Sequence, residues 1–184
     1  MREDAQDNGP RGHLARRLFL LLMLVLPPLL AGLGRSDCVF HMEVRALQSA
    51  QETWYRLADD PRAWLIPSWN GEPRVNKPPL AVWIDLLAWT GVDPARSTVD
   101  QLVYRARVAA ALLAMLLVLG LFITIARCSD TTVGATAAIM LGTSVLFLRQ
   151  ARLASYDTYF MAFSGLAVCA GVWALAPRER PGPR

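Results

Sequence analysis

The chain has 184 residues, of which 54% are hydrophobic and 18% are charged, and its formal net charge is +4 at pH 7. This apolar content and the clustering of the apolar residues exclude an ordinary soluble domain. The modest positive charge gives no reason to expect a nucleic-acid partner, and the sequence contains no P-loop, GxGxxG, HExxH or internal repeat. We therefore expect an all-α integral membrane protein.

The first expected membrane span covers residues 18–34, an uncharged run close to the lower limit of about 17 residues for crossing a bilayer. Pro27 and Pro28 predict a kink in this helix. Residues 1–17 form an N-terminal tail that we expect in the cytoplasm. The alternative is a cleaved signal peptide, because arginines precede the apolar stretch and small residues follow it.

Residues 35–101 then form an outer loop that is far longer than the usual connection between bundled helices, and such length suggests a function. A short helix is expected to begin near Met42 and to continue through Trp54. It carries Glu43, which follows the first span closely enough to lie at the bilayer surface and face a cavity. The alternative is a solvated surface helix on which Glu43 and Arg45 are ordinary exposed charges.

A polar segment at residues 70–80 combines turn chemistry with a stiffly presented cation. Its Asn-Gly pair predicts a tight turn, and the Pro-Pro pair after Lys77 fixes φ and removes two backbone donors. Lysine is a compact point charge suited to phosphate, so Lys77 is a candidate for holding an anionic group. The alternative is an ordinary loop lysine beside a proline that starts a helix.

Residues 80–91 are apolar but short, and they include Asp85. Trp83 and Trp89 suit an interface between membrane and water, so we expect a helix that lies at the membrane surface. Counting this segment as a fifth span would place the C-terminal arginines outside, which fits the positive-inside rule less well.

Three further spans are expected at residues 102–126, 131–148 and 158–176, with a short outer loop at 149–157 and a cytoplasmic tail at 177–184. With four spans, the arginines at both chain ends and after the second span lie on one side, which the positive-inside rule assigns to the cytoplasm. The cysteines fall at different levels of this topology, so no disulfide or zinc framework is expected. They are Cys38, Cys128 and Cys169.

Asp157 lies at the junction of the third and fourth expected spans. An ionisable residue at a membrane boundary is a functional candidate, and Arg152 is its expected partner. The competing interpretation makes Asp157 the N-cap of the fourth span, because an Asp before Thr158 is a good cap. Asp157 could be both a functional residue and the N-cap of this span.

Six motifs follow one another along most of the chain. They are MEVR at 42–45, AWLIP at 63–67, NGEP at 70–73, KPPLAVW at 77–83, YRARV at 104–108 and RLASYD at 152–157. Together they resemble the N-terminal part of the membrane-embedded GT-C glycosyltransferases. The branch is that of aminoarabinose transferases and dolichyl-phosphate-mannose protein mannosyltransferases, glycosyltransferase family 39 type.

This resemblance implies a sugar carried on a polyprenyl phosphate and transferred with inversion to a lipid or protein acceptor on the outer face of the cell membrane. It implies that Glu43 acts as the base or orients the acceptor, that Lys77 contacts the donor phosphate, and that Asp157 lines the same cavity. A phosphate leaving group needs a cation, and an attacking hydroxyl needs a proton acceptor. Arg45 and Arg152 are the further candidates for binding substrate.

Two positions depart from the family pattern. Many relatives have Asp-Glu where this chain has Met42-Glu43, so that either Glu43 or Asp37 would have to supply the base. Relatives also carry Glu before the lysine, where this chain has Asn76, which weakens the case for a bound metal. No cofactor is expected besides the polyprenyl-phosphate donor.

The transferases of this family carry many more spans and a C-terminal soluble domain, so we expect the chain to be an N-terminal portion, with the rest in a continuing or second polypeptide. Another hypothesis is a noncatalytic membrane subunit, or an inactive remnant, that docks through the outer loop. Its anchors would be Trp54, Trp64 and Trp69. A transporter is less well supported, because no inverted repeat is visible.

Overall fold

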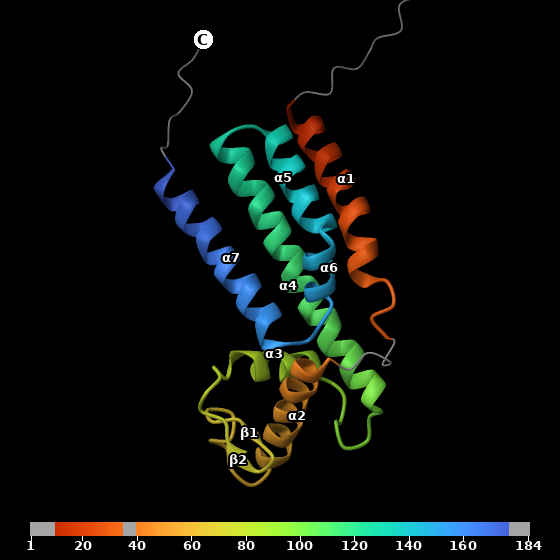
Figure 1. Cartoon of the computed structure of the whole chain (residues 1–184), viewed down its shortest axis with the longest axis vertical. Helices are drawn as coiled ribbons and strands as arrows, with labels where there is room; N and C mark the ends of the chain where they lie inside the picture. Colours follow the sequence, from red (N-terminus) through yellow and green to blue (C-terminus); the bar gives the residue numbers. More distant parts are fainter. Residues whose placement is uncertain (1–9, 35–39, 177–184) are drawn as a thin grey trace, which may run out of the picture.

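The computed structural model describes residues 10–34 and 40–176. This part of the chain contains seven α-helices and one two-stranded antiparallel hairpin (Figure 1). The elements are α1 (Pro10–Leu30), α2 (His41–Arg56), β1 (Ser68–Trp69), β2 (Glu72–Pro73), α3 (Leu80–Ala88), α4 (Val99–Cys128), α5 (Thr131–Thr143), α6 (Val145–Ala151) and α7 (Tyr156–Leu175).

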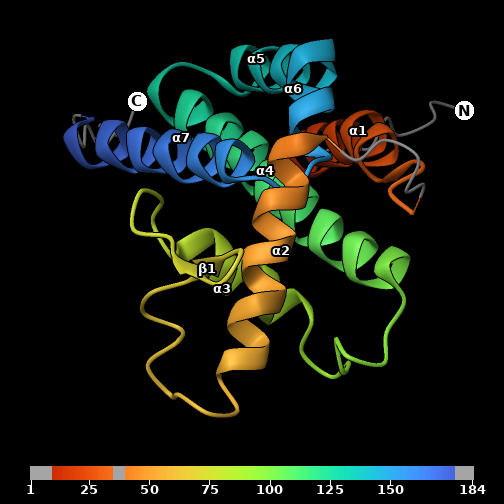
Figure 2. The same cartoon turned by 60° about the horizontal axis from the view of Figure 1, so that its bottom comes forward.

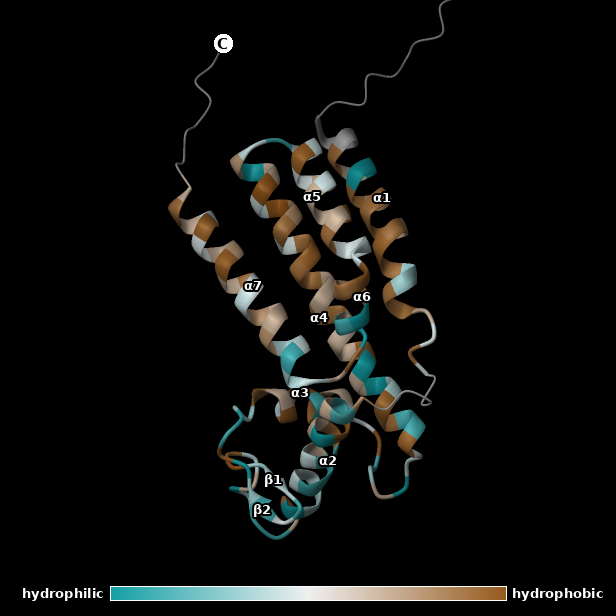
Figure 3. Cartoon of the chain, in the orientation of Figure 1, coloured by the Kyte–Doolittle hydropathy of each residue, from teal (hydrophilic) through white to brown (hydrophobic). Residues whose placement is uncertain are grey.

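The long helices form a bundle in which α4 packs on both α5 and α7, and α1 packs on α5 (Figure 1). Apolar side chains from several helices form its main core: Leu21 and Val25 of α1 are fully buried and cluster with Val118 and Phe122 of α4. Burying such side chains is the main favourable contribution to folding. The helices of the bundle are coloured mostly as hydrophobic, whereas the end of the molecule that carries α2, β1 and β2 is coloured mostly as hydrophilic (Figure 3).

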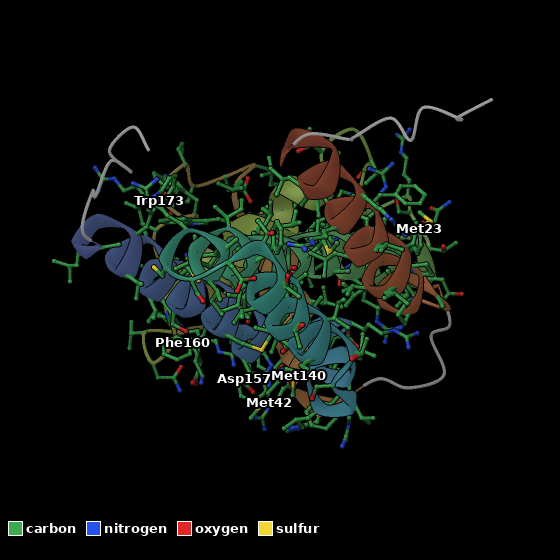
Figure 4. All side chains as sticks on the ribbon, turned by 90° about the horizontal axis from the view of Figure 1, so that it is seen from above. Met23, Met42, Met140, Asp157, Phe160 and Trp173 are labelled. Atoms are coloured by element: carbon green, nitrogen blue, oxygen red, sulfur yellow. The ribbon has the colours of Figure 1, made fainter. Side chains whose placement is uncertain are left out.

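The outer surface of the bundle is also apolar. Met23, Met140, Phe160 and Trp173 are about half exposed or more, and they lie around the periphery of the molecule (Figure 4). Within the described ranges, α4 and α7 are long and apolar enough to cross a membrane, and the bent α5–α6 pair adds a third crossing if it counts as one span. The chain is therefore a mostly helical protein with two or three candidate membrane spans.

Two of the expected spans differ from the structure. The run at 18–34 is helical only to Leu30, because the chain forms turns over residues 31–34. The run at 131–148 is not one straight helix, because α5 and α6 meet at a bend of 66°. Ser144 between them is extended, with ψ 128°, which interrupts the helical hydrogen bonds. The hydroxyl of Thr143 also bonds back to the carbonyl of Ile139, a contact that commonly bends helices.

Helices α2 and α3 pack together with the hairpin into a head at one end of the bundle (Figures 1 and 2). The short helices predicted near 42–54 and 80–91 are thus confirmed as helices. Trp89, however, is only 3% exposed and donates its indole N–H to the carbonyl of Leu102, 2.9 Å away. The prediction that Trp89 lies at an interface is wrong, because it forms part of the core between α3 and α4. Trp83 remains at the surface of the head, half-buried.

Basic residues gather at the bundle end remote from the head. Arg17 of α1 donates to the hydroxyl of Thr131 at the start of α5. The guanidinium of Arg127, at the end of α4, lies 5.4 Å from the ring centre of Trp173 near the end of α7. The topology expected from the sequence has these arginines on one side of the membrane, and in the structure they lie at one end of the bundle.

Close packing of α4 on α5 depends on Gly134. A Cβ atom there would lie 2.9 Å from the backbone nitrogen of Ala126 and 2.9 Å from the carbonyl oxygen of Phe122, and neither atom can rotate away. We expect Gly134→Ala to lower the free energy of unfolding by about 1–3 kcal/mol. Gly171→Ala is the matched control, because nothing lies within 4 Å of its added methyl group. Unfolding by SDS in mixed detergent micelles measures both variants, and equal stabilities would contradict the prediction.

Candidate functional site

A buried ion pair connects the head to the bundle. The Glu43 carboxylate of α2 is fully buried and accepts from Nε and Nη2 of Arg107 on α4, both at 2.8 Å. The backbone N–H of Ala154 donates to the same carboxylate at 3.0 Å. Arg107 also donates to the carbonyl of Leu33, after α1, at 3.2 Å. The ion pair thus links four parts of the chain.

Glu43 therefore does not face a cavity, and it is not an exposed charge on a solvated helix. A buried carboxylate needs a partner and hydrogen bonds, and Glu43 has both. The sequence analysis did not identify Arg107 as this partner, although Arg107 belongs to the YRARV motif at 104–108. Asp37, the other candidate base, and Cys38 lie outside the described residues.

Asp85 is a second buried acid that the sequence analysis noted only as a charge in an apolar segment. It lies on α3 and is fully buried, and the Tyr159 hydroxyl of α7 donates to its Oδ1. Its Oδ2 has no hydrogen-bond partner within residues 10–34 and 40–176. The pKa of Asp85 is raised from 3.8 to about 8, because burial and, to a smaller extent, the Glu43 charge raise it by more than the Tyr159 hydrogen bond lowers it. Asp85 is thus mostly protonated at neutral pH.

Cations and aromatic rings alternate where the head meets the start of α7. The Arg45 guanidinium lies 5.0 Å from the ring centre of Trp69, and the Arg74 guanidinium lies 5.7 Å from the same ring. Arg74 also lies 4.8 Å from the ring centre of Tyr156, which in turn is 5.8 Å from Nζ of Lys77. We call these five residues the cation–aromatic ladder. The face of an aromatic ring attracts a cation electrostatically.

The hairpin, which contributes Trp69 to the ladder, is fixed to α2. Asn70 and Gly71 both have positive φ, 54° and 79°, as the predicted tight turn requires. The Glu52 carboxylate accepts from their backbone N–H groups at 2.8 and 3.2 Å. Burial raises the pKa of Glu52, but the hydrogen bonds from Gly71 and Asn70 outweigh burial and leave the pKa below its usual value. Glu52 therefore holds the turn as a carboxylate.

Arg74 is held in place by α2, where its Nη1 donates to the carbonyl of Arg45 and to the hydroxyl of Ser49, both at 2.9 Å. An open pocket of about 350 Å³ adjoins it. Nε of Arg45, which also lines the pocket, is buried and has no hydrogen-bond partner among the described residues. The pocket is lined by Arg45, Trp69, Glu72, Pro73, Arg74, Val75 and Asn76.

Ion pairs within the described part of the chain do not neutralise the positive charge of the ladder. Among the described residues, none of the ion pairs involves Arg45, Arg74 or Lys77. Glu72 lines the pocket without pairing to them. Three neighbouring cations without an ion-paired acid favour an anionic ligand, and arginine is well suited to phosphate because its N–H donors form a rigid fork.

The remaining candidates, Asp157 and Arg152, are not members of the ladder, although Asp157 follows Tyr156 in the chain. Asp157 is exposed in the first turn of α7, and no ion pair joins it to Arg152 in the described part of the chain. Figure 4 shows it at the edge of the molecule. The N-cap of α7 is Ser155, whose hydroxyl accepts from the N–H of Thr158, so Asp157 is not the cap. Arg152 donates instead to the carbonyl of Ala31 after α1.

The structure defines a mostly helical protein with candidate membrane spans and a polar head that carries a cationic pocket. Comparison of the chain with protein-family models, curated proteins and solved structures finds no match. Sequence analysis identified Arg45 and Lys77, and the structure brings them into one ladder. The sequence did not predict the other three members of the ladder, Arg74, Trp69 and Tyr156, although each lies in or next to a quoted motif.

Proposed function

We propose that the chain is the N-terminal portion of a membrane glycosyltransferase of the GT-C type. It would move a sugar from a polyprenyl-phosphate donor to a lipid or protein acceptor at the outer face of the cell membrane. In this proposal α1, α4, the α5–α6 pair and α7 are four spans, and the bundle end with Arg17 and Arg127 faces the cytoplasm. The head then lies outside, at the interface where a lipid phosphate resides.

The cation–aromatic ladder is the observation that carries this proposal. Two of its cations, Arg45 and Arg74, line an open pocket, and none of its three cations belongs to an ion pair between described residues. Tyr156 is also the first residue of the 20-residue helix α7, whose N-terminal end adds partial positive charge. We assign Lys77 and Arg74 to the donor phosphate, with Arg45 supporting them from α2.

The carboxylates take different roles in this proposal. Both oxygens of Glu43 are engaged by Arg107, so we assign Glu43 to positioning α2 and the ladder rather than to proton transfer. Asp157 is exposed and directly follows Tyr156, so we assign it as the proton acceptor for the attacking hydroxyl. The sugar would pass to that hydroxyl with inversion as its bond to the phosphate oxygen breaks. Arg152 would stabilise the loop before α7 through its bond to Ala31.

The proposal is tested by binding of farnesyl phosphate to the purified chain in an uncharged detergent. We expect Lys77→Ala and Arg74→Ala each to weaken binding about 10- to 100-fold, because each removes a charge-assisted hydrogen bond. Arg62→Ala is the matched control: Arg62 is an exposed cation of the same outer segment outside the ladder. Equal affinities in Lys77→Ala, Arg74→Ala and Arg62→Ala would overturn the donor site. In the assembled enzyme, sugar transfer should fall in the same two variants.

A noncatalytic subunit is the second candidate, favoured by an exposed apolar patch on the head. Trp64, Leu65 and Ile66 are 45%, 50% and 50% exposed, and the ring of Trp64 lies 5.2 Å from that of Trp83. Such a patch can anchor a partner or the bilayer. Loss of partner capture in Trp64→Ala, with farnesyl phosphate binding unchanged by the ladder variants, would favour this candidate.

A further inference from the structure

A second pocket lies at the other end of α3 from the ladder, between the end of α3 and the first turns of α4. Its volume is about 470 Å³. Lys77 precedes the first residue of α3, whereas Ala88, the last residue of α3, lines this pocket. The pocket is lined by Ala88, Val92, Gln101, Tyr104, Arg105, Val108, Ala109 and Leu112. We call it the α3–α4 groove.

The groove has a polar end and an apolar end. Gln101, Tyr104 and Arg105 belong to the part of α4 nearest the head, and Val108 and Leu112 follow at helical spacing along the same helix. Arg105 and Leu112 are seven positions apart on the helix, which is about 10 Å at a rise of about 1.5 Å per residue. The groove thus changes from cationic to apolar along α4.

Arg105 supplies the charge of this groove. It is exposed, and its Nη1 donates to the carbonyl of Thr90 at 3.2 Å, which orients the guanidinium. A guanidinium has five N–H donors, so most of them remain available to a ligand. The lining, all from described residues, includes this one cation and no carboxylate.

The apolar end of the groove continues into the exposed surface of a candidate span. Leu112, Leu116 and Ile123 of α4 are 52%, 53% and 48% exposed, and their spacing places them on one side of the helix. A stripe of this kind faces acyl chains when α4 crosses a bilayer. An occupant of the groove would therefore have its apolar part in the membrane and its anionic part at the surface.

We propose that the α3–α4 groove binds an anionic phospholipid, with its phosphate against Arg105 and one acyl chain along Val108 and Leu112. The charge of the groove selects the headgroup, and its continuity with the stripe on α4 selects a lipid rather than a soluble anion. The site is separate from the cation–aromatic ladder and does not depend on sugar transfer.

The test uses the purified full chain in an uncharged detergent, with phosphatidylglycerol or phosphatidylcholine added and retained lipid counted by native mass spectrometry. We expect the wild-type chain to retain phosphatidylglycerol preferentially. Arg105→Gln should reduce that retention by about fivefold, the effect of one cation near a lipid surface, and should leave phosphatidylcholine unchanged. Arg105→Lys should preserve the preference. The matched control is Arg96→Gln, because the Arg96 side chain is 88% exposed and lies outside the groove.

A further variant covers the case in which Arg105→Gln disturbs folding through its bond to Thr90. Ala109→Trp fills the apolar part of the groove and should reduce retention of both lipids while Arg105 keeps its charge. Equal retention of the two lipids by the wild-type chain would overturn the proposal, because the groove would then accept any apolar segment, including a helix of a partner. Equal loss in Arg105→Gln and Arg96→Gln would overturn it as well.

Discussion

Replacing Glu43 by glutamine is expected to lower the free energy of unfolding by about 3–5 kcal/mol, because it removes one member of a buried ion pair. Arg107 is 5% exposed and Glu43 is fully buried, so water cannot replace the lost carboxylate. The same substitution disturbs the N–H of Ala154, which donates to Glu43. SDS unfolding in mixed detergent micelles measures the change.

The matched control is Glu72→Gln, which makes the same chemical change at an exposed position and should alter stability by less than about 0.5 kcal/mol. The double replacement Glu43→Leu with Arg107→Met should recover most of the lost stability, because it removes both members of the buried pair. A single Glu43→Gln variant as stable as Glu72→Gln would show that the ion pair does not hold the head on the bundle.

The second large effect is a dependence of stability on pH that Asp85 causes. Its pKa is about 8 in the folded protein and near 3.8 when the chain is unfolded. Between these values the folded protein keeps a proton that the unfolded chain has released, so stability falls as the pH rises from about 4 to about 8. The slope is about 1.4 kcal/mol per pH unit, which amounts to a loss on the order of 5 kcal/mol over the window.

Asp85→Asn should remove this slope, because an amide does not titrate. The amide oxygen can still accept from the Tyr159 hydroxyl, so we expect the variant to match the wild-type protein near pH 4 and to exceed it in stability at pH 8. Asp157→Asn is the control, since Asp157 is exposed and its replacement should leave the slope in place. Unfolding titrations at pH 4, 6 and 8 distinguish the two variants. A wild-type stability that does not fall over this range would contradict the assignment of a protonated, buried Asp85.

The two acids illustrate the limits of reading sites from sequence. Glu43 was recognised from its motif, but its burial was not, because the ion pair joins residues 64 positions apart. Asp85 was recognised only as an unusual residue in an apolar run, and its partner Tyr159 lies 74 positions away. Periodicity and spacing are local, so they cannot identify a hydrogen-bond partner on a distant helix.

Local chemistry was sufficient for several other features. Apolar runs predicted the long helices α4 and α7, and the Asn-Gly pair predicted the turn in which Asn70 and Gly71 have positive φ. The bend between α5 and α6 was missed, because a hydropathy run does not reveal a single extended residue such as Ser144. The burial of Trp89 was missed, because tryptophan occurs both at membrane interfaces and in protein cores and the residue type alone does not distinguish the two.

The sequence by itself determined that this is a helical protein with apolar helices suited to a membrane, and that a rigid, cationic segment at residues 70–80 lies between them. Those properties follow from hydrophobicity, turn chemistry and charge, which each short segment carries alone. Only the tertiary structure decided that Arg45, Arg74 and Lys77 share one ladder, and that Glu43 is a structural partner of Arg107. The reason is physical: these contacts form only when α2, α4, α7 and the hairpin pack together.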